Sequence, residues 1–580
     1  MIKELSKSIR EYKKVSILTP ILMIGEVILE VTIPFIIAQL VNRISEGCEI
    51  EVILKYGGVL FICACISLFF GGLGGFTSAK ASGGFAKNLR KDLYYRIQDY
   101  SFENIDKFSS SSLVTRMTTD INNVQMAYMM LIRIAIRAPL MMIFAVIMAF
   151  IMGGKLAFLF VIVMPILAFG LIIIGLNALP SFKRVFKKYD KLNESIEENV
   201  MSIRAVKGFA REGYEKKKFK KASVDIQADF TRAERIVSCI APVFQFCLYT
   251  VMVVVLLFGS KITIETMGVE LNVGQISALL TYGMQILMSL NMLSMIFVML
   301  TMSMESAKRI VEVLREKPSV TNPENPVYDV KDGSIDFENV SFKYSKDAEA
   351  FALSDINLHI DSGETIGILG GTGSSKTTLI QLLSRLYDTT QGSVKVGGLD
   401  VRDYDIKSLR DEVSVVLQKN VLFAGTIKDN LRWGNKDASD AEIEEACRLA
   451  QADEFIQQFP DKYNTWIEQG GTNVSGGQKQ RLCIARALLK KPKILILDDS
   501  TSAVDMKTDA LIRQGFKKFI PETTKIIIAQ RVASVQDADK IIVMQSGKIN
   551  AIGTHEQLMQ SNEIYREIYE QQTKGGAAVE

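Results

Sequence analysis

A glycine-rich stretch near residue 370 has the residue types that bind phosphate. A buried-strand pattern over residues 365–369 leads directly into it, and a helical pattern follows. This order lets backbone N–H groups and a helix N-terminus surround a phosphate. Lys376 is expected to reach the β- and γ-phosphates of a nucleoside triphosphate, and the Thr377 hydroxyl is expected to bind Mg²⁺. This stretch, which we call the P-loop, comprises Gly370, Gly371, Thr372, Gly373, Ser374, Ser375, Lys376, Thr377 and Thr378.

Two segments further along the chain have patterns suited to the same chemistry. Residues 493–497 form a hydrophobic strand pattern that ends in Asp498 and Asp499. Between this strand and the P-loop, a serine followed by two glycines opens a predicted helix. A serine hydroxyl, backbone N–H groups and the helix dipole can together hold a γ-phosphate there. The residues at this helix start are Ser475, Gly476, Gly477 and Gln478.

The ordered set of motifs resembles the nucleotide-binding domain of ABC transporters. The strand that ends in two aspartates resembles a Walker B motif, and residues 473–481 resemble the ABC signature, which is specific to this superfamily among P-loop proteins. The resemblance implies that Asp498 assists Mg²⁺ through a water molecule and that Tyr344 stacks on adenine. It also implies that Gln418, in the Q-loop, serves both metal binding and catalysis. Residues 502–505 match the D-loop.

Three positions depart from the family's pattern around one nucleotide's phosphates. Ser375 stands where the pattern has glycine, Asp499 where it has the water-orienting glutamate, and Gln530 where it has a histidine. Aspartate is one methylene shorter than glutamate, and a misplacement of about 1 Å can cost about 100-fold in rate. Glutamine can hydrogen-bond a γ-phosphate but cannot carry a proton. We therefore expect this site to bind ATP but to hydrolyse it poorly; harmless drift in a working ATPase is the alternative.

The signature is intact by contrast, and this asymmetry indicates a partner. In ABC proteins each nucleotide lies between one domain's Walker motifs and the other domain's signature. The chain resembles the degenerate-site subunit of heterodimeric bacterial multidrug exporters, whose partner would be a different half-transporter with intact glutamate and histidine. The resemblance implies ATP-driven export of small amphipathic compounds, with ATP retained at Lys376 and Asp498. The alternatives are a homodimeric lipid or peptide exporter and an ATP-binding regulatory or channel-like membrane subunit.

The first half of the chain is predicted to cross a lipid bilayer, which takes about 20 apolar residues per helix. Lys and Arg are concentrated in the N-terminal tail and in residues 80–128 and 181–235. These segments and both chain ends are therefore expected to be cytoplasmic. Both internal segments have helical spacing and are expected to extend the helices beyond the membrane. The six apolar stretches are residues 15–41, 52–76, 129–152, 156–180, 240–259 and 276–300.

These patterns predict an all-α membrane domain of six helices with long cytoplasmic extensions, fused to an α/β P-loop nucleotide-binding domain. The expected division is a transmembrane domain over residues 1–315, a linker over 316–332 and a nucleotide-binding domain over 333–575. Segments near residues 100–110 and 203–213 resemble the coupling segments of ABC exporters, of which the second contacts the partner's domain. The expected location is a bacterial inner membrane. The net charge of +4 gives no case for nucleic-acid binding.

Two acidic residues lie within the first apolar stretch. Glu26 and Glu30 are one helical turn apart, and a carboxylate at that depth usually faces a partner or an aqueous cavity. One interpretation is a cation-attracting patch in the substrate pathway. The other, which we favour, is a structural pairing with Arg133 or Arg137.

Overall fold

The structure is a computed structural model that describes residues 1–345, 348–500 and 504–577. Its contacts divide the chain into two units: Met1–Gln98 with Ser110–Glu316, and Asp99–Ser109 with Lys317–Glu580. The first unit is built of helices, and the second combines helices with β-sheets. The predicted fold class, a helical membrane domain fused to an α/β domain, is therefore confirmed.

Long helices in the first unit carry the predicted apolar stretches. The six stretches fall on α2, α3, α6, α7 with the turn before it, α10 and α11. The helices are α1 (Ile2–Ser6), η1 (Lys7–Tyr12), α2 (Lys13–Ser45), α3 (Ile50–Gln98), α5 (Ser110–Thr115), η2 (Arg116–Asp120), α6 (Ile121–Gly153), η3 (Gly154–Ala157), α7 (Phe158–Met201), α8 (Ile203–Gly208), α9 (Glu212–Val237), α10 (Ile240–Glu265) and α11 (Val273–Arg315).

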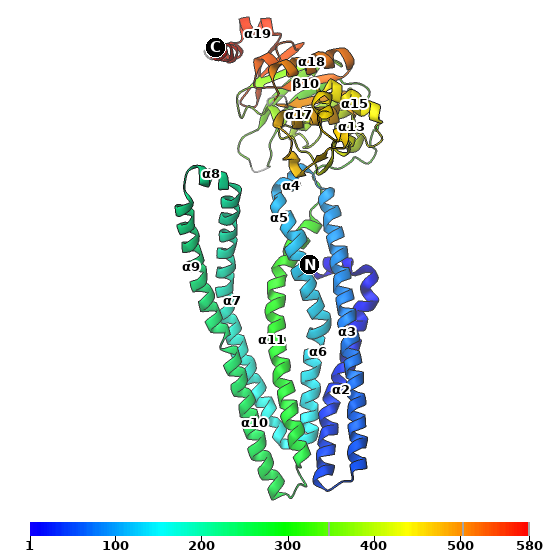
Figure 1. Ribbon diagram of the computed structural model, residues 1–580, viewed down its shortest axis with the longest axis vertical. Coiled ribbons are helices and arrows are strands. Elements are labelled where there is room, and N and C mark those ends of the chain that lie inside the picture. The colour runs from blue at the N-terminus through cyan, green and yellow to red at the C-terminus, as the bar shows by residue number, and fades with distance from the viewer. Residues whose placement is uncertain (346–347, 501–503, 578–580) are drawn as a thin grey trace. The chain divides into compact units, whose positions relative to one another are not determined.

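Among the described residues, five continuous helical stretches have the length and composition to cross a membrane. The third of them includes α6 and the first part of α7, and the chain reverses between these two helices (Figure 1), where η3 begins at Gly154. Gly154 has φ +47°, a backbone conformation that favours glycine. The five stretches are Ile2–Ser45, Ile50–Gln98, Ser110–Phe182, Glu212–Glu265 and Val273–Arg315.

Several of these helices continue well beyond the length that a bilayer requires. Helices α2, α3, α6 and α11 pack against one another, and α7 packs against α9. The short helix α8 lies at the tip between α7 and α9 (Figure 1). Ile203 and Phe209, within and directly after α8, are 43% and 80% exposed. The segment near residues 203–213 therefore has exposed apolar side chains among exposed basic ones in this single chain.

The second unit contains a mostly parallel sheet of six strands in the order β12-β11-β3-β10-β9-β6 and an antiparallel sheet in the order β2-β1-β4-β5. Strands β3, β10, β9 and β6 are parallel neighbours, and all five residues of β9 are buried. Burial on both faces explains why their sequences are continuous apolar runs. The strands are β1 (Ile335–Phe342), β2 (Leu353–Ile360), β3 (Thr365–Gly370), β4 (Gln391–Val396), β5 (Leu399–Asp400), β6 (Val413–Val416), β7 (Gly425–Thr426), β8 (Trp466–Ile467), β9 (Ile494–Asp498), β10 (Thr524–Ile528), β11 (Lys540–Gln545) and β12 (Lys548–Gly553).

Helices surround these sheets and complete two hydrophobic cores. One core contains buried side chains of α12 with β1 and β2, and the other contains those of α17 with β9 and β11. The helices of this unit are α4 (Phe102–Phe108), α12 (Lys376–Leu383), α13 (Ile406–Glu412), α14 (Ile427–Arg432), α15 (Asp440–Leu449), α16 (Asp453–Gln457), η4 (Lys462–Asn464), η5 (Gln469–Gly471), α17 (Gly476–Leu488), α18 (Met506–Phe519), η6 (Val532–Ser534), α19 (His555–Ser561) and α20 (Glu563–Ala577).

Candidate functional site

Four segments of the predicted nucleotide site follow neighbouring strands of the parallel sheet. The P-loop follows β3, Asp498 and Asp499 lie at the end of β9, Gln530 follows β10, and Gln418 follows β6. The sheet order β3-β10-β9-β6 makes these strands consecutive neighbours. The carboxyl ends of parallel strands lie at one edge of a sheet, where α/β domains bind their ligands. The fold therefore gathers at one edge residues that are far apart in sequence.

The P-loop is folded around its own lysine. Lys376 Nζ donates hydrogen bonds to the carbonyl oxygens of Gly370 at 2.8 Å and Gly371 at 2.9 Å, and to Ser374 Oγ at 3.1 Å. A Cβ atom at Gly370 would lie only 2.4 Å from the carbonyl oxygen of Met544, so the loop has no room for a side chain there. Burial lowers the pKa of Lys376. A phosphate that replaced these neutral oxygens would offer the ammonium group a charged acceptor.

Ser375 holds the position where the family's pattern has glycine. It is the N-cap of α12 and has φ +69° and ψ 26°, the left-handed conformation. An L-residue in this conformation carries a steric cost of roughly 1–2 kcal/mol that glycine does not carry. Ser375 therefore strains the backbone at the start of the phosphate-binding helix α12.

Ser375→Gly is expected to stabilise the full chain by about 1 kcal/mol, because glycine relieves the left-handed strain. Thermal unfolding of the detergent-purified chain measures this change. Ser374→Gly is the matched control, because Ser374 is buried and its hydroxyl accepts a bond from Lys376. The control is expected to lower stability. If Ser375→Gly gave no gain, the strain would be absorbed elsewhere in the loop.

Two oxygen-bearing side chains meet beside the P-loop. Thr377 Oγ1 donates to the Asp498 carboxylate, at 3.0 Å from Oδ2 and 3.3 Å from Oδ1. Asp498 is 3% exposed, and burial raises its pKa. Hydroxyl and carboxylate oxygens are the hard ligands that Mg²⁺ prefers. The residues present therefore fit a Mg²⁺ ion held with bound nucleotide.

The three predicted catalytic residues meet at one atom, Asp499 Oδ2. Gln530 Nε2 donates to Asp499 Oδ2 at 2.8 Å, and Gln418 Nε2 donates to the same oxygen at 3.2 Å. The backbone N–H of Asp499 donates to Ile528 O at 2.9 Å, which ties it to the end of β10. The carboxylate that stands where the family has glutamate is thus held by two amide groups.

Tyr344, predicted to stack on adenine, is fixed through its hydroxyl group. This hydroxyl lies 2.9 Å from Thr378 Oγ1 and donates to Gln381 Oε1 at 3.0 Å. Its ring lies perpendicular to the Tyr387 ring at a centroid distance of 5.3 Å. Tyr344 remains 45% exposed, so part of the residue is available to a ligand. Tyr387 in turn donates to Asp106 of α4 at 2.6 Å.

Helix α4, in the segment near residues 100–110, belongs to the same unit as the nucleotide site. Asn104 Nδ2 donates to Lys317 O at 3.0 Å, and the backbone N–H of Val320 donates to Ser101 Oγ at 2.9 Å. Together with the Tyr387–Asp106 bond, these contacts fix α4 on the surface next to Tyr344. The sequence places Asp106 in the segment that resembles a coupling segment, but it does not predict the contact with Tyr387, because nothing local links residues so far apart.

The signature segment forms a capped helix start. Ser475 is the N-cap of α17; its Oγ accepts from Gln478 N at 3.3 Å, and its own N–H donates to Gln478 Oε1 at 2.9 Å. Ser475 and Gly476 are exposed, and Gly477 is half-buried. The N-terminal end of α17 is therefore open to an incoming anion. In the D-loop, Ser502 and Ala503 lie outside the described residues.

The acidic pair of α2 meets Arg137 of α6. Arg137 Nη2 donates to both carboxylate oxygens of Glu30, at 2.6 and 2.7 Å, and Arg137 Nε lies 3.7 Å from Glu26 Oε1. Gln285 Nε2 donates to the backbone carbonyl of Glu30 at 3.2 Å. Among the described residues, Glu26 Oε2 and Gln285 Oε1 are buried without a hydrogen-bond partner. A polar cluster therefore lies inside the helical unit, with Glu30 more fully paired than Glu26.

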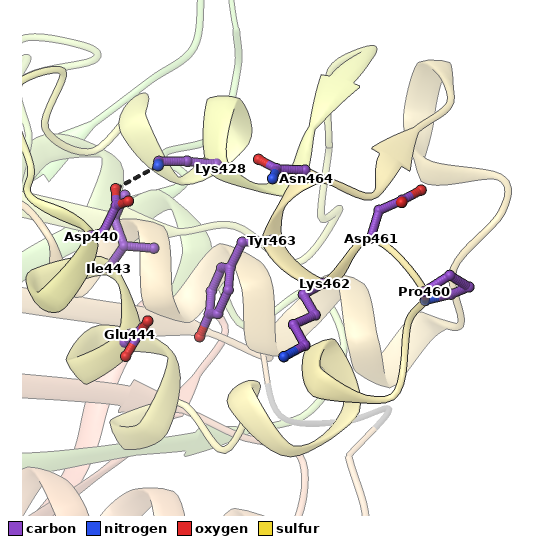
Figure 2. A pocket seen from close by; sticks show the side chains of 9 residues that line it. All are labelled: Lys428, Asp440, Ile443, Glu444, Pro460, Asp461, Lys462, Tyr463 and Asn464. Atoms are coloured by element: carbon purple, nitrogen blue, oxygen red, sulfur yellow. Dashed lines mark ion pairs between the residues drawn. The ribbon is translucent and has the colours of Figure 1, made fainter.

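A pocket of about 330 Å³ lies in the helical part of the second unit (Figure 2). Lys428 of α14 and Asp440 of α15 form an ion pair of 2.5 Å at its edge. Within the described part of the chain, no residue of the predicted nucleotide site lines this pocket. The pocket is therefore separate from the phosphate-binding edge of the sheet.

Comparison with known proteins identifies both halves of the chain. Residues 16–290 match the family described as the ABC transporter transmembrane region, and residues 353–502 match the family described as ABC transporter. The chain is 34% identical over 564 residues to the uncharacterised ABC transporter ATP-binding protein YfiB of Bacillus subtilis, covering 97% of each protein. It is 32% identical over 575 residues to an uncharacterised ABC transporter ATP-binding protein of Mycobacterium tuberculosis, again covering 97% of each.

The fold has a close counterpart among solved structures. A bacterial Atm1-family ABC exporter with ATP bound superposes with a TM-score of 0.81 at 22% identity, covering 96% of this chain and 98% of that chain. A membrane-spanning helical region and one nucleotide-binding domain on the same chain are the arrangement of an ABC half-transporter. The chain belongs to the ABC transporter family. It is a multi-pass membrane protein that binds ATP and acts with a dimer partner, and its bacterial relatives are consistent with the inner membrane.

Proposed function

We propose that this chain is one subunit of a heterodimeric exporter of amphipathic compounds. Its own Walker site retains ATP and hydrolyses it slowly, and its signature completes a second site in a different half-transporter. The partner carries the glutamate and histidine that this chain lacks. ATP binding closes the two nucleotide-binding domains, and the coupling segments relay this closure to the membrane helices.

The geometry around Asp499 carries this proposal. A general base must reach the water from which it takes a proton. Asp499 is shorter than glutamate, and its Oδ2 already accepts bonds from Gln530 and Gln418. Gln530 has no titratable nitrogen, so it cannot pass a proton onward. The arrangement suits the holding of a phosphate and a water molecule better than the activation of that water.

The rest of the site retains what nucleotide binding requires. Lys376 and the P-loop N–H groups would hold the phosphates, Tyr344 the adenine, and Thr377 and Asp498 the Mg²⁺ ion. When bound, Mg²⁺ would neutralise charge on the β- and γ-phosphates. The exposed cap at Ser475 supports a role in the partner's site. The exposed apolar side chains of Ile203 and Phe209 support a contact with the partner's domain.

The deciding experiment compares the Mg-ATPase activity of the purified chain with that of the chain co-purified with a half-transporter that carries glutamate and histidine. The chain alone is expected to be about 100-fold slower than the pair, the scale of a 1 Å misplacement. Lys376→Ala in the chain alone controls for contaminating ATPases. Full activity of the chain alone, as a dimer, would favour a homodimeric exporter instead.

We further propose that the two intramembrane carboxylates differ in role: Glu30 holds Arg137, and Glu26 attracts cationic substrates. Glu26→Gln is expected to lower transport of a cationic substrate severalfold more than that of a neutral one. Glu30→Gln is expected to lower both equally, because it removes the charged partner that holds the half-buried Arg137 in place. Uptake of labelled compounds into inverted vesicles measures both variants. Equal losses for Glu26→Gln would assign Glu26 to structure as well.

A further inference from the structure

The C-terminal helix α20 packs on the nucleotide-binding domain through one face. Tyr565 is fully buried, and Ile568 and Tyr569 pack against the same core as Val532. These positions follow the i, i+3, i+4 spacing of a helix face, and Gln572 continues it at i+7. Gln572 is thus a polar residue at the next position of a packing face.

The side chain of Gln572 bridges two backbone groups just after β10. Its Oε1 accepts a hydrogen bond from the N–H of Val532 at 2.8 Å, and its Nε2 donates to the carbonyl oxygen of Gln530 at 2.8 Å. One amide group therefore pairs with the chain on both sides of Arg531, at the segment that carries Gln530. The Gln530 side chain at the same time donates to Asp499 Oδ2.

We propose that Gln572 is a positioning residue for the nucleotide site. By fixing the backbone of residues 530–532, it orients the Gln530 amide towards Asp499 and the γ-phosphate region. The link to nucleotide rests on the proposed role of Gln530 as a γ-phosphate contact. The C-terminal helix thereby controls how long ATP stays in this chain's Walker site.

The docking of α20 does not depend on Gln572. The helix is anchored two turns earlier, where the Tyr565 hydroxyl lies 2.7 Å from His555 Nδ1 and the Tyr565 N–H donates to Asn562 Oδ1 at 2.9 Å. Asn562 Nδ2 donates to Asn550 Oδ1 at 2.7 Å and ties the helix start to β12. A change at Gln572 therefore alters the segment after β10 without releasing the helix.

The test uses three variants of the full-length, detergent-purified chain. Gln572→Ala removes both bonds, and Gln572→Glu keeps the acceptor for Val532 N–H but places a carboxylate against the carbonyl oxygen of Gln530. Gln571→Ala, at the neighbouring exposed position, is the matched control. Residue-resolved hydrogen exchange reports on the Val532 amide. Dissociation of the fluorescent probe TNP-ATP reports on nucleotide retention, and thermal unfolding verifies the fold.

Gln572→Ala is expected to speed exchange at Val532 by about 3- to 10-fold, the scale of one hydrogen bond. It is expected to speed TNP-ATP release by a similar factor. Gln572→Glu is expected to leave Val532 protected but still speed release, and Gln571→Ala is expected to change neither. Unchanged exchange at Val532 in Gln572→Ala would overturn the positioning role.

Gln530→Ala separates this inference from the proposed function. Faster release in Gln530→Ala with unchanged release in Gln572→Ala would overturn the control by α20 and leave the role of Gln530 standing. Unchanged release in Gln530→Ala would overturn the γ-phosphate contact itself. In that case the exchange result alone still decides whether Gln572 holds the segment.

Discussion

Ser475→Arg is expected to lower the Mg-ATPase activity of the heterodimeric pair by at least about 100-fold, the range seen when one transition-state hydrogen-bond donor is removed. Ser475 caps α17 at an exposed helix start, where its hydroxyl and the following N–H groups would meet the partner's γ-phosphate. An arginine removes the hydroxyl and fills the space. Asp499→Ala is expected to retain most of the activity, because turnover takes place in the other site. Phosphate release by the reconstituted pair measures both variants.

A second capped helix supplies the control for Ser475→Arg. Ser439 caps α15 with the same reciprocal pattern, accepting from Glu442 N at 3.3 Å, and it is exposed as well. Ser439→Arg is expected to cost about 1 kcal/mol of stability through the lost cap, without a large change in turnover. Loss of all activity in Asp499→Ala would place turnover in this chain's own site and overturn the assignment.

Local patterns in the sequence predict which elements form, but they do not predict the contacts between side chains of distant loops. The apolar stretches and the P-loop context are local patterns, and the structure has helices and strands at those positions. The meeting of Asp499 with Gln418 and Gln530 depends on the strand order β3-β10-β9-β6. The motif resemblance implied that these residues share a site. It did not imply that two amides bind one carboxylate oxygen, because that depends on side-chain placement within ångströms.

Local sequence patterns also do not predict strained backbone conformations or contacts between residues far apart in the chain. The sequence shows Ser375 as a departure from glycine, whereas its left-handed backbone is seen only in the structure. The segment around Asn104 had a recognisable motif, but its bond to Lys317 joins residues 213 positions apart. The helical spacing of the sequence does place Gln572 on the same helix face as Tyr565. A polar residue at such a position is usually a surface residue, so the pattern alone did not single it out.

Asp499→Glu combined with Gln530→His is expected to raise the Mg-ATPase activity of the purified chain by about 10- to 100-fold, the range that a correction of about 1 Å spans. Glutamate restores the missing methylene and brings the carboxylate closer to the attacking water. Histidine can donate to the γ-phosphate and can also carry a proton. The product of the two single-variant gains is expected to be smaller than the gain of the double variant, because both residues act on the same hydrogen bond at Asp499 Oδ2.

The same double variant tests whether these two departures are the cause of slow turnover. Lys376→Ala in the double-variant background is expected to abolish the gain, because the lysine holds the γ-phosphate that the activated water attacks. If the double variant hydrolysed ATP no faster than the wild-type chain and the wild-type rate were already high, the departures at Asp499 and Gln530 would be harmless drift. If the double variant and the wild-type chain both hydrolysed ATP slowly, adding Ser375→Gly would show whether the strained P-loop limits the rate. A gain only with this third change would move the cause from the water-activating groups to the geometry of the bound phosphates.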